Sequence, residues 1–255
     1  MNQEPPVACD GEDVSLTRSK MSTSIEMLKK KNFDPVTIVS LIPDQTDEFR
    51  DKLRILSTFE NTLPEFRFDL MSETGFDGRI NILKKIIENQ SDSILTYRSN
   101  NIEELNKFYS ISLENGENLV DIDGTVLDKI GFKPSLKHTL ISYHLNQVTP
   151  IRDLVSNTYQ RGYRAVKMAV RIDQDYEFFS LCREIALNRK EGRIISIVPM
   201  GTGSGIYRLI SAITVSDFTY TKYGIETGEG QFDFRLFQEI KSNIKSNAEG
   251  NDQLI

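Results

Sequence analysis

A regular alternation of strand-like and helix-like segments runs through the chain from residue 37 onward, and this feature most restricts the fold. Runs rich in β-branched or aromatic residues are followed by segments in which apolar residues recur at helical spacing. The expected strands cover residues 37–42, 65–70, 93–98, 118–123, 138–143, 163–170, 193–198 and 217–221. Eight such units in about 210 residues predict an α/β protein, a single-domain (β/α)8 TIM barrel, because doubly wound sheets more often have five or six strands.

Composition predicts a tail on each side of this barrel. Residues 1–35 are rich in Ser, Thr, Glu and Lys, which is typical of a flexible N-terminal tail. Within it, Ile25 and Leu28 would share one face of a short helix that covers one end of the barrel. The expected barrel domain therefore spans residues 36–245, and residues 246–255 are expected to form a C-terminal tail.

Charge and composition argue against several classes of function. The formal net charge is −6, there is no tryptophan and no long basic run, so a nucleic-acid partner is not indicated. Cys9 and Cys182 are far apart and belong to no metal-binding motif, which argues against a disulfide or a zinc site. No apolar run has the length of a signal peptide or a membrane span. We therefore expect a cytoplasmic protein with no membrane partner.

One expected strand carries a lysine between apolar residues. Lys167 lies in the middle of the run 163–170, and a strand covered on both faces is a nearly continuous apolar run. Burial lowers the pKa of a lysine, and the neutral amine can attack a carbonyl carbon to form an imine. The alternative is that Lys167 lies near a strand end and extends its long side chain to water.

Polar residues also occur towards the carboxyl ends of other expected strands, where the active sites of such barrels lie. Glu65, Arg67 and Asp69 alternate with phenylalanines and are expected to point to one side of their strand. The other polar residues in such positions are Thr96, Arg98, Asp121, Asp123, Ser142 and His144. Buried charges are costly unless they pair, so a purely structural network is the alternative to a binding site. Charges contributed by several strands to one interior favour the binding site.

Two glycine-rich loops follow the last two expected strands. Residues 200–205 form a turn whose backbone amides suit an anion, and Arg208 follows with a guanidinium that can bind a carboxylate through two parallel hydrogen bonds. The turn matches neither a phosphate loop nor a dinucleotide-binding fingerprint. Gly228 and Gly230 in the second loop indicate a mobile lid, with an ordinary strand-to-helix turn as the alternative.

Taken in order, these segments resemble type I 3-dehydroquinate dehydratase over residues 37–240. The histidine, the lysine and the arginine after the seventh strand give the resemblance most of its specificity. The matching segments are Glu-Phe-Arg-Phe-Asp at 65–69, Leu-Thr-Tyr-Arg-Ser at 95–99, Val-Asp-Ile-Asp at 120–123, Ile-Ser-Tyr-His at 141–144, Val-Lys-Met-Ala at 166–169, Met-Gly with Arg208, and Gly-Glu-Gly-Gln at 228–231.

The resemblance implies a step of aromatic amino acid biosynthesis in the shikimate pathway, the dehydration of 3-dehydroquinate without a metal or an organic cofactor. By analogy, Lys167 forms a Schiff base with the C3 ketone of the substrate. His144 then removes the C2 proton and returns a proton to the departing C1 hydroxyl, and an imidazole pKa near 6.5 suits both steps. The residues implied in substrate binding are Arg208, Thr227 and Gln231 at the carboxylate, and Glu65, Arg67 and Arg98 at the ring hydroxyls.

The sequence also departs from the family pattern. Family members usually carry a glutamate four residues after the arginine of the third strand, where it orients the histidine, and this position is Ile102 here. Glu103 is expected to take this role with a shift of one residue. Thr227 stands for the lid serine and keeps the hydroxyl, whereas Glu229 stands for the lid proline and adds a negative charge. Reduced activity is therefore expected.

Other functions remain open at this point. One alternative is a non-catalytic relative that binds a quinate-like ligand as a sensor or scaffold, and another is a different imine-forming barrel such as an aldolase. Retention of both Lys167 and His144 favours the dehydratase, because a binding protein needs no buried lysine beside a base. An aldolase would not require Arg208 and Gln231. The expected partner is the small-molecule substrate, and a homodimer is an open alternative.

Overall fold

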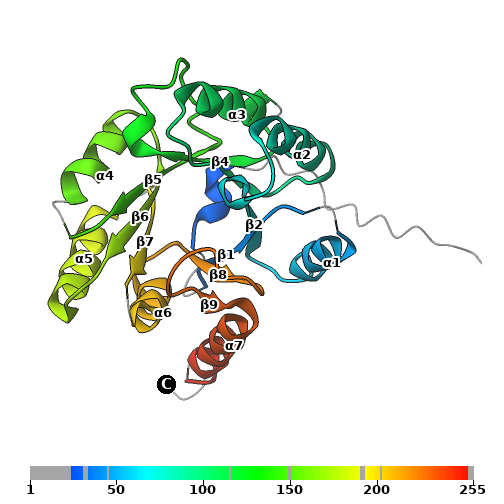
Figure 1. Cartoon of the computed structure of the whole chain (residues 1–255). Helices are drawn as coiled ribbons and strands as arrows, with labels where there is room; N and C mark the ends of the chain where they lie inside the picture. Colours follow the sequence, from blue (N-terminus) through cyan, green and yellow to red (C-terminus); the bar gives the residue numbers. More distant parts are fainter. Residues whose placement is uncertain are drawn as a thin grey trace, which may run out of the picture.

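Parallel strands form the centre of the molecule, and helices surround them (Figure 1). The computed structural model describes residues 24–30, 34–44, 46–114, 116–148, 151–189, 193–201 and 203–251. Its nine-stranded parallel sheet has the order β7-β6-β5-β4-β3-β2-β1-β8-β9. The strands are β1 (Val36–Leu41), β2 (Thr62–Arg67), β3 (Ile94–Thr96), β4 (Leu119–Asp123), β5 (Thr139–Leu145), β6 (Ala165–Arg171), β7 (Ile194–Met200), β8 (Phe218–Lys222) and β9 (Phe232–Asp233).

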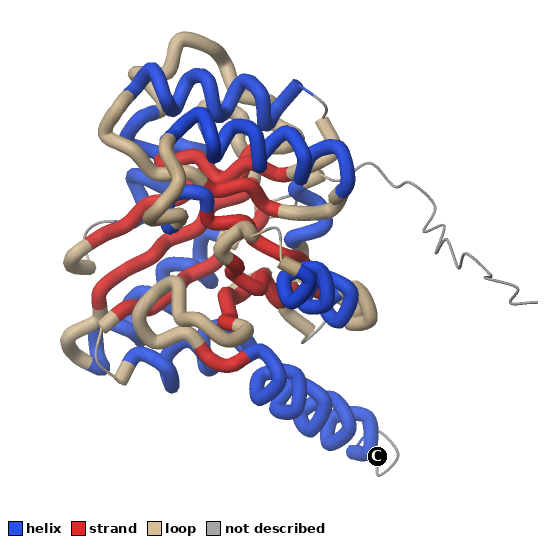
Figure 2. The backbone as a smooth tube through the Cα atoms, turned by 45° about the vertical axis from the view of Figure 1, so that its right-hand side comes forward, coloured by secondary structure: helices blue, strands red, loops and turns tan. Residues whose placement is uncertain are grey.

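The helices lie on the outer face of the curled sheet, as the tube view also shows (Figure 2). They are α1 (Asp47–Leu56), α2 (Phe76–Asn89), α3 (Ile102–Glu114), α4 (Ile151–Gln160), α5 (Asp175–Asn188), α6 (Ser204–Thr214) and α7 (Phe234–Asn251). Local capping fixes where several of them begin. The Thr46 hydroxyl accepts a hydrogen bond from the Phe49 N–H at the start of α1, and Gln174 and Glu177 form a capping box at the start of α5.

The barrel closes where β7 meets β8, and side chains replace a regular ladder there. The Asp217 N–H donates to the Ile195 carbonyl (3.0 Å), and the Asp217 carboxylate accepts the Ile195 N–H in return (2.9 Å). The Ser216 hydroxyl accepts the Ile197 N–H (3.1 Å). The predicted single-domain barrel of parallel strands is confirmed, with the short β9 added beside β8 and a 3-10 helix, η3 (Gly124–Val126), in the segment after β4.

A 3-10 helix, η1 (Ile25–Leu28), packs against the amino end of the barrel. Ile25 and Leu28 are buried there with residues from the starts of the strands, and the Ile25 N–H donates to the Lys137 carbonyl (3.0 Å). Burial of two such side chains stabilises the fold by about 3 to 6 kcal/mol. The part of the expected N-terminal tail at residues 24–30 is therefore packed on the barrel, while residues 1–23 lie outside the described residues.

Most expected strand boundaries differ from the structure by one to three residues, and the largest shift affects the second strand. The second strand ends at Arg67 and turns into a 3-10 helix, η2 (Phe68–Leu70), so Asp69 does not continue the strand as predicted. The last helix, α7, extends to Asn251 and includes much of the expected C-terminal tail, and residues 252–255 lie outside the described part of the chain.

Candidate active site

The candidate site is built around a lysine inside the barrel. Lys167 lies in the middle of β6, and its Nζ atom is 3.2 Å from Asp121 Oδ2 and 3.9 Å from Glu65 Oε1. The same atom lies 3.9 Å from the centroid of the Tyr220 ring, a cation–π distance. Only 9% of the lysine side chain is exposed. The site therefore places one buried cation between two carboxylates and the face of a ring.

This environment corrects the apolar setting that the sequence predicted for Lys167. Side chains alternate between the two faces of a strand, so the neighbours Val166 and Met168 pack in the core between the strands and helices. Lys167 instead faces the interior, with Ser142 of β5 and Ser196 of β7 as its partners in the register. Most of the apolar run in the sequence thus lies on the helix-facing side of β6, whereas the side chains that contact Lys167 Nζ in the interior are two carboxylates and a tyrosine ring.

Asp121 joins two cations at the floor of the site. Its carboxylate accepts hydrogen bonds from Arg98 Nη2 (2.7 Å) and Lys167 Nζ (3.2 Å), and the residue is fully buried. Burial alone would raise the pKa of Asp121, but Arg98, Lys167 and a hydrogen bond with Ser142 outweigh it and hold the pKa below its usual range. Asp121 is therefore a carboxylate at every ordinary pH.

Glu65 connects this floor to the neighbouring strands. Its two carboxylate oxygens accept hydrogen bonds from the hydroxyls of Ser40 on β1 (2.5 Å) and Thr96 on β3 (2.8 Å). Gln231 Nε2 in turn donates to the Ser40 hydroxyl (3.3 Å), which links the glycine-rich loop after β8 to the same network. Ser40 and Glu65 are directly paired in the register of β1 and β2, so the fold itself holds this contact in place.

The two arginines expected at the ring hydroxyls are both paired with carboxylates. Arg67 forms two parallel hydrogen bonds with Asp69, of 2.9 and 2.6 Å, and donates a third to the Thr227 carbonyl (3.2 Å). Arg98 donates to Asp121 and also to the Ser142 hydroxyl (2.6 Å). About a fifth of each side chain is exposed, 20% for Arg67 and 22% for Arg98. These arginines are thus fixed by the protein and keep part of their surface towards solvent.

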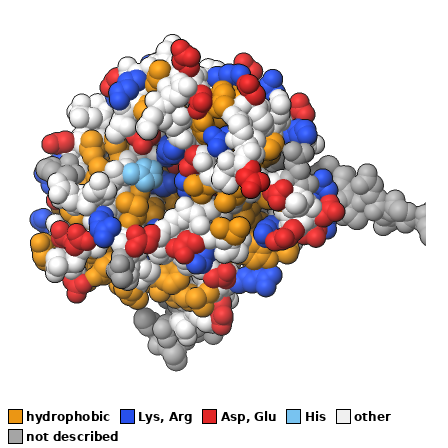
Figure 3. Space-filling model, viewed as in Figure 1, with side chains coloured by type: hydrophobic (Ala, Val, Ile, Leu, Met, Phe, Trp, Pro, Cys, Tyr) orange, Lys and Arg blue, Asp and Glu red, His pale blue; other side chains and the backbone are white. Residues whose placement is uncertain are grey.

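His144 lies one layer closer to the mouth of the barrel than Lys167. It is two residues beyond Ser142 on β5, and its side chain is exposed. The pKa of His144 is lowered to about 4 by partial desolvation and by the cations of Lys167 and Arg98. The imidazole is therefore neutral at neutral pH. The space-filling view shows a histidine at the surface beside lysine or arginine side chains that lie deeper in a hollow (Figure 3).

The structure does not bring Glu103 to His144. Glu103 is exposed on the first turn of α3, and no hydrogen bond or ion pair joins its carboxylate to His144 within the part of the chain that the structure describes. The next residue, Glu104, points inward and accepts hydrogen bonds from the Tyr97 hydroxyl (2.6 Å) and the Ser99 hydroxyl (3.0 Å). Successive helical residues are about 100° apart around the axis, so only one of the two glutamates can face the barrel.

Arg208 is buried at the edge of the site with carbonyl partners. Its Nε atom donates to the Pro199 carbonyl (2.7 Å), and its Nη2 atom donates to the Glu229 carbonyl. No ion pair involving Arg208 is present among the described residues, although only 3% of the residue is exposed. Burial lowers the pKa of Arg208 to about 10, against the opposing effect of Glu226 and Glu229, so the guanidinium still carries its charge at neutral pH.

The loop after β8 brings the remaining predicted residues next to Arg208. Gln231 Oε1 accepts hydrogen bonds from the backbone N–H (2.9 Å) and the hydroxyl (3.0 Å) of Thr227. Glu226 holds the other end of the loop, because its carboxylate accepts the Gly230 N–H (2.9 Å) and pairs with Lys222 (3.2 Å). The loop is thus a closed turn that rests on Arg208 through the Glu229 carbonyl.

Two curated proteins are similar to this chain in sequence. No protein-family model matches the chain. A 3-dehydroquinate dehydratase from Thermoplasma volcanium is 29% identical over 215 residues, which are 81% of this chain and 91% of that protein. A 3-dehydroquinate dehydratase from Thermoplasma acidophilum is 25% identical over 198 residues, 77% of this chain and 85% of that protein. The chain is therefore similar in sequence to 3-dehydroquinate dehydratases over most of its length.

Solved structures of such enzymes share the fold. The 3-dehydroquinate dehydratase from Geobacillus kaustophilus matches with a TM-score of 0.64 at 14% identity, over 83% of this chain and 91% of that chain. The type I 3-dehydroquinate dehydratase from Clostridium difficile matches with a TM-score of 0.64 at 16% identity, over 84% and 93% of the two chains. The barrel predicted from the eight strand-helix units is therefore also the fold of these enzymes.

One residue that the dehydratase resemblance did not include also lines the site. Tyr220 was not predicted, and its buried hydroxyl has no hydrogen-bond partner among the described residues. Burial raises its pKa well above the usual value, and the carboxylates of Glu65 and Asp121 act in the same direction. The alternation Phe218-Thr-Tyr220-Thr-Lys222 on β8 was the available signal, because every second residue of a barrel strand faces the interior.

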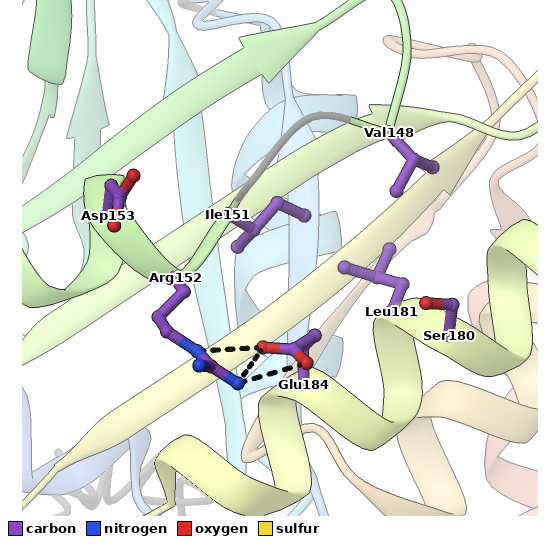
Figure 4. Close-up of a pocket in the computed structure, with 7 residues that line it drawn as sticks. All are labelled: Val148, Ile151, Arg152, Asp153, Ser180, Leu181 and Glu184. Carbon is purple, nitrogen blue, oxygen red and sulfur yellow. Dashed lines mark hydrogen bonds and ion pairs between the residues drawn. The ribbon is translucent and has the colours of Figure 1, made fainter.

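A surface groove outside the barrel mouth contains no buried lysine or arginine like those of the candidate site. It measures about 400 Å³ and lies between α4 and α5, where its lining residues are Val148, Ile151, Arg152, Asp153, Ser180, Leu181 and Glu184 (Figure 4). Arg152 and Glu184 already form an ion pair across it (3.1 Å). In the described part of the chain, no group of three or more His, Cys, Asp or Glu side chains could hold a metal ion, and no helix is long and apolar enough to cross a membrane.

Proposed function

We propose that the protein is a cytoplasmic type I 3-dehydroquinate dehydratase, which converts 3-dehydroquinate to 3-dehydroshikimate in the shikimate pathway through a Schiff base on Lys167. The observation that carries this proposal is the position of Lys167 inside the barrel, on the strand beside the one that bears His144. The barrel domain at residues 36–245 would supply the whole site. The sequence similarity to named 3-dehydroquinate dehydratases supports the substrate class.

The first chemical step would be imine formation. The Lys167 amine attacks the C3 carbonyl carbon of the substrate, and the carbonyl oxygen leaves as water. The ammonium must release a proton before attack, and water that enters with the substrate can accept it, while the Asp121 and Glu65 carboxylates, at 3.2 and 3.9 Å, hold the lysine in place. Once the iminium forms, the same carboxylates and the Tyr220 ring face stabilise its positive charge.

The second step would be the elimination of water across C1 and C2. His144 is neutral because its pKa is lowered to about 4, so it can accept the C2 proton while the electron pair moves to the iminium nitrogen. The resulting imidazolium is a strong acid and returns a proton to the C1 hydroxyl, which leaves as water. Hydrolysis of the iminium then releases the product and restores the Lys167 amine.

The substrate carboxylate would bind at Arg208. This guanidinium is buried without a carboxylate partner among the described residues, whereas Arg67 and Arg98 each have one. Thr227 and Gln231 lie on the loop that covers Arg208 and would complete the clamp. The exposed parts of Arg67 and Arg98, together with Glu65, would then meet the ring hydroxyls.

Borohydride trapping with 3-dehydroquinate tests the imine. We expect the protein to gain the mass of the reduced adduct at Lys167, and the absorbance of the conjugated product to rise in the untrapped reaction. Lys167→Ala should abolish both signals. Lys222→Ala is the matched control and should retain the adduct. Lys222 is another lysine of the barrel, at the end of β8, where it pairs with Glu226. An adduct at another lysine, or turnover by Lys167→Ala, would refute the mechanism.

One observation favours a second function, a binding protein without turnover. No carboxylate orients His144 among the described residues, and fixing the tautomer of a general base can matter greatly for the rate. Such a protein would bind quinate and give a trapped adduct with 3-dehydroquinate, yet form no product. Product formation in the untrapped reaction distinguishes the two functions.

A further inference from the structure

The first residue of α6 has a hydroxyl that the protein itself does not use. Ser204 is 1% exposed, and its Oγ atom has no hydrogen-bond partner among the described residues. A buried hydroxyl without a partner is unfavourable, and such groups are uncommon in folded proteins. Serine hydroxyls elsewhere on this helix are satisfied, since Ser211 donates to the Arg208 carbonyl (3.0 Å). Ser204 is therefore a candidate donor for a ligand.

Ser204 and Arg208 lie on the same face of α6, one turn apart. The side chains of both residues lie next to Gly230 in the loop after β8. A Cβ atom added to Gly230 would lie 2.1 Å from Ser204 Oγ and 3.6 Å from Arg208 Nε. Gly230 also directly precedes Gln231, which bonds to Thr227. The hydroxyl thus lies beside the guanidinium and beneath the loop that carries the other two clamp residues.

The start of α6 adds a favourable potential for an anion. Gly203 occupies the position before the helix with φ of +78°, and it has no side chain that could cap the first turn. The partial positive charge of a helix N-terminus therefore adds to the full charge of Arg208. In the described structure, the Glu229 carbonyl is the lid group that accepts from Arg208 Nη2, and a carboxylate is a stronger acceptor than a carbonyl.

We propose that Ser204 is a further ligand of the substrate carboxylate: its hydroxyl donates to one carboxylate oxygen while Arg208 binds the other, and the Glu229 carbonyl moves away from Arg208 when the ligand enters. This inference rests on the proposed function for the identity of the ligand, a hydroxylated ring with a carboxylate. It makes Ser204 a specificity-determining residue, because its hydroxyl forms a stronger hydrogen bond to a charged carboxylate than to the neutral carbonyl of an ester or amide.

Binding of quinate and of its uncharged methyl ester tests the role of Ser204. Dissociation constants are measured by calorimetry for the wild-type chain, Ser204→Ala and the control Ser211→Ala, a buried serine of the same helix. We expect Ser204→Ala to weaken quinate binding about tenfold or more, the range for a hydrogen bond to a charged group, and to leave ester binding nearly unchanged. Ser211→Ala should alter neither constant. If Ser204→Ala does not fold, Ser204→Cys replaces it, with the same loss expected because a thiol is a weak donor.

An unchanged constant for quinate in Ser204→Ala would overturn the inference, and so would equal losses for quinate and the ester, which indicate a structural role or a buried water. Turnover of 3-dehydroquinate by the wild-type chain is followed in parallel and tests the proposed function separately. If the wild-type chain shows no turnover but its quinate binding depends on Ser204, the carboxylate site is supported and the dehydratase activity is refuted. A wild-type chain that binds no quinate overturns the carboxylate site.

Discussion

Replacement of Asp121 by asparagine removes the charge that joins Lys167 to Arg98 and nearly preserves the shape of the side chain. The carboxylate is fully buried, 2.7 Å from Arg98 Nη2 and 3.2 Å from Lys167 Nζ. Loss of one partner from a buried ion pair typically costs about 3 to 5 kcal/mol, because the remaining charges stay desolvated. Glu65 lies 3.9 Å from Lys167 and offsets part of this cost. We expect Asp121→Asn to lower the free energy of unfolding by about 3 kcal/mol at pH 7.

The pH dependence gives the prediction a second test. The pKa of Asp121 in the folded protein lies below its unfolded value of about 3.9, so its stabilisation is fully present above that value and is lost as the pH falls towards the folded pKa. The difference between wild type and Asp121→Asn should therefore be constant above about pH 5 and shrink below about pH 4. Urea unfolding followed by circular dichroism over this pH range measures both quantities.

Asp123→Asn is the matched control for this experiment. Asp123 ends the same strand, but its carboxylate only accepts hydrogen bonds from the backbone and hydroxyl of Thr125. Its replacement should cost about 1 kcal/mol, the usual contribution of a helix-capping side chain. A cost below about 1 kcal/mol for Asp121→Asn, or an equal cost for Asp123→Asn, would show that the buried pairing does not stabilise the barrel in the way argued.

Four other experiments test the site. Arg208→Ala should weaken binding of the substrate carboxylate by about 2 to 5 kcal/mol, seen as a higher KM, and an unchanged KM would place the carboxylate elsewhere. The pKa of His144 near 4 predicts that kcat/KM stays level as the pH falls from 8 to about 5, and an acid limb with a midpoint near 6.5 would contradict it. Gly230→Ala would place a Cβ atom 2.1 Å from Ser204 Oγ at a φ of +77°, so thermal unfolding should show a loss of about 1 to 3 kcal/mol, and an unchanged midpoint would refute this contact. Glu103→Gln should leave turnover nearly unchanged, since the exposed carboxylate contacts no described site residue, and a large fall in rate would restore its orienting role.

The barrel could be predicted because its signals are local in the sequence. Each strand is a short run of β-branched or aromatic residues, and each helix has an apolar face, so the order of units follows from the chain itself. The position of Lys167 in the middle of a strand was predictable for the same reason, since the apolar run on both sides of it marks the strand. These predictions do not depend on which strands pair with one another.

The pairing of the charges was not predictable, because it depends on contacts between strands far apart in the chain. Asp121 meets Lys167 across 46 positions and Arg98 across 23, and both contacts depend on the exact register of three strands. Glu103 shows a second kind of limit. The choice between two adjacent glutamates on α3 is decided by where the helix begins, and a helix boundary is uncertain by one or two residues in any assignment.

The distribution of counter-ions over the site indicates what kind of ligand it accepts. Lys167 lies between two carboxylates, and Arg67 and Arg98 each hold one, so these cations are nearly neutralised by the protein itself. Arg208 donates hydrogen bonds only to carbonyls among the described residues. An anionic group of a ligand therefore gains the most binding free energy there. Under the proposed function, the ligand therefore carries a carboxylate that binds at α6 and an electrophilic carbon that reaches Lys167. A ring with a ketone and a carboxylate on separate carbons meets both conditions, whereas a phosphate ester or an uncharged sugar meets only one.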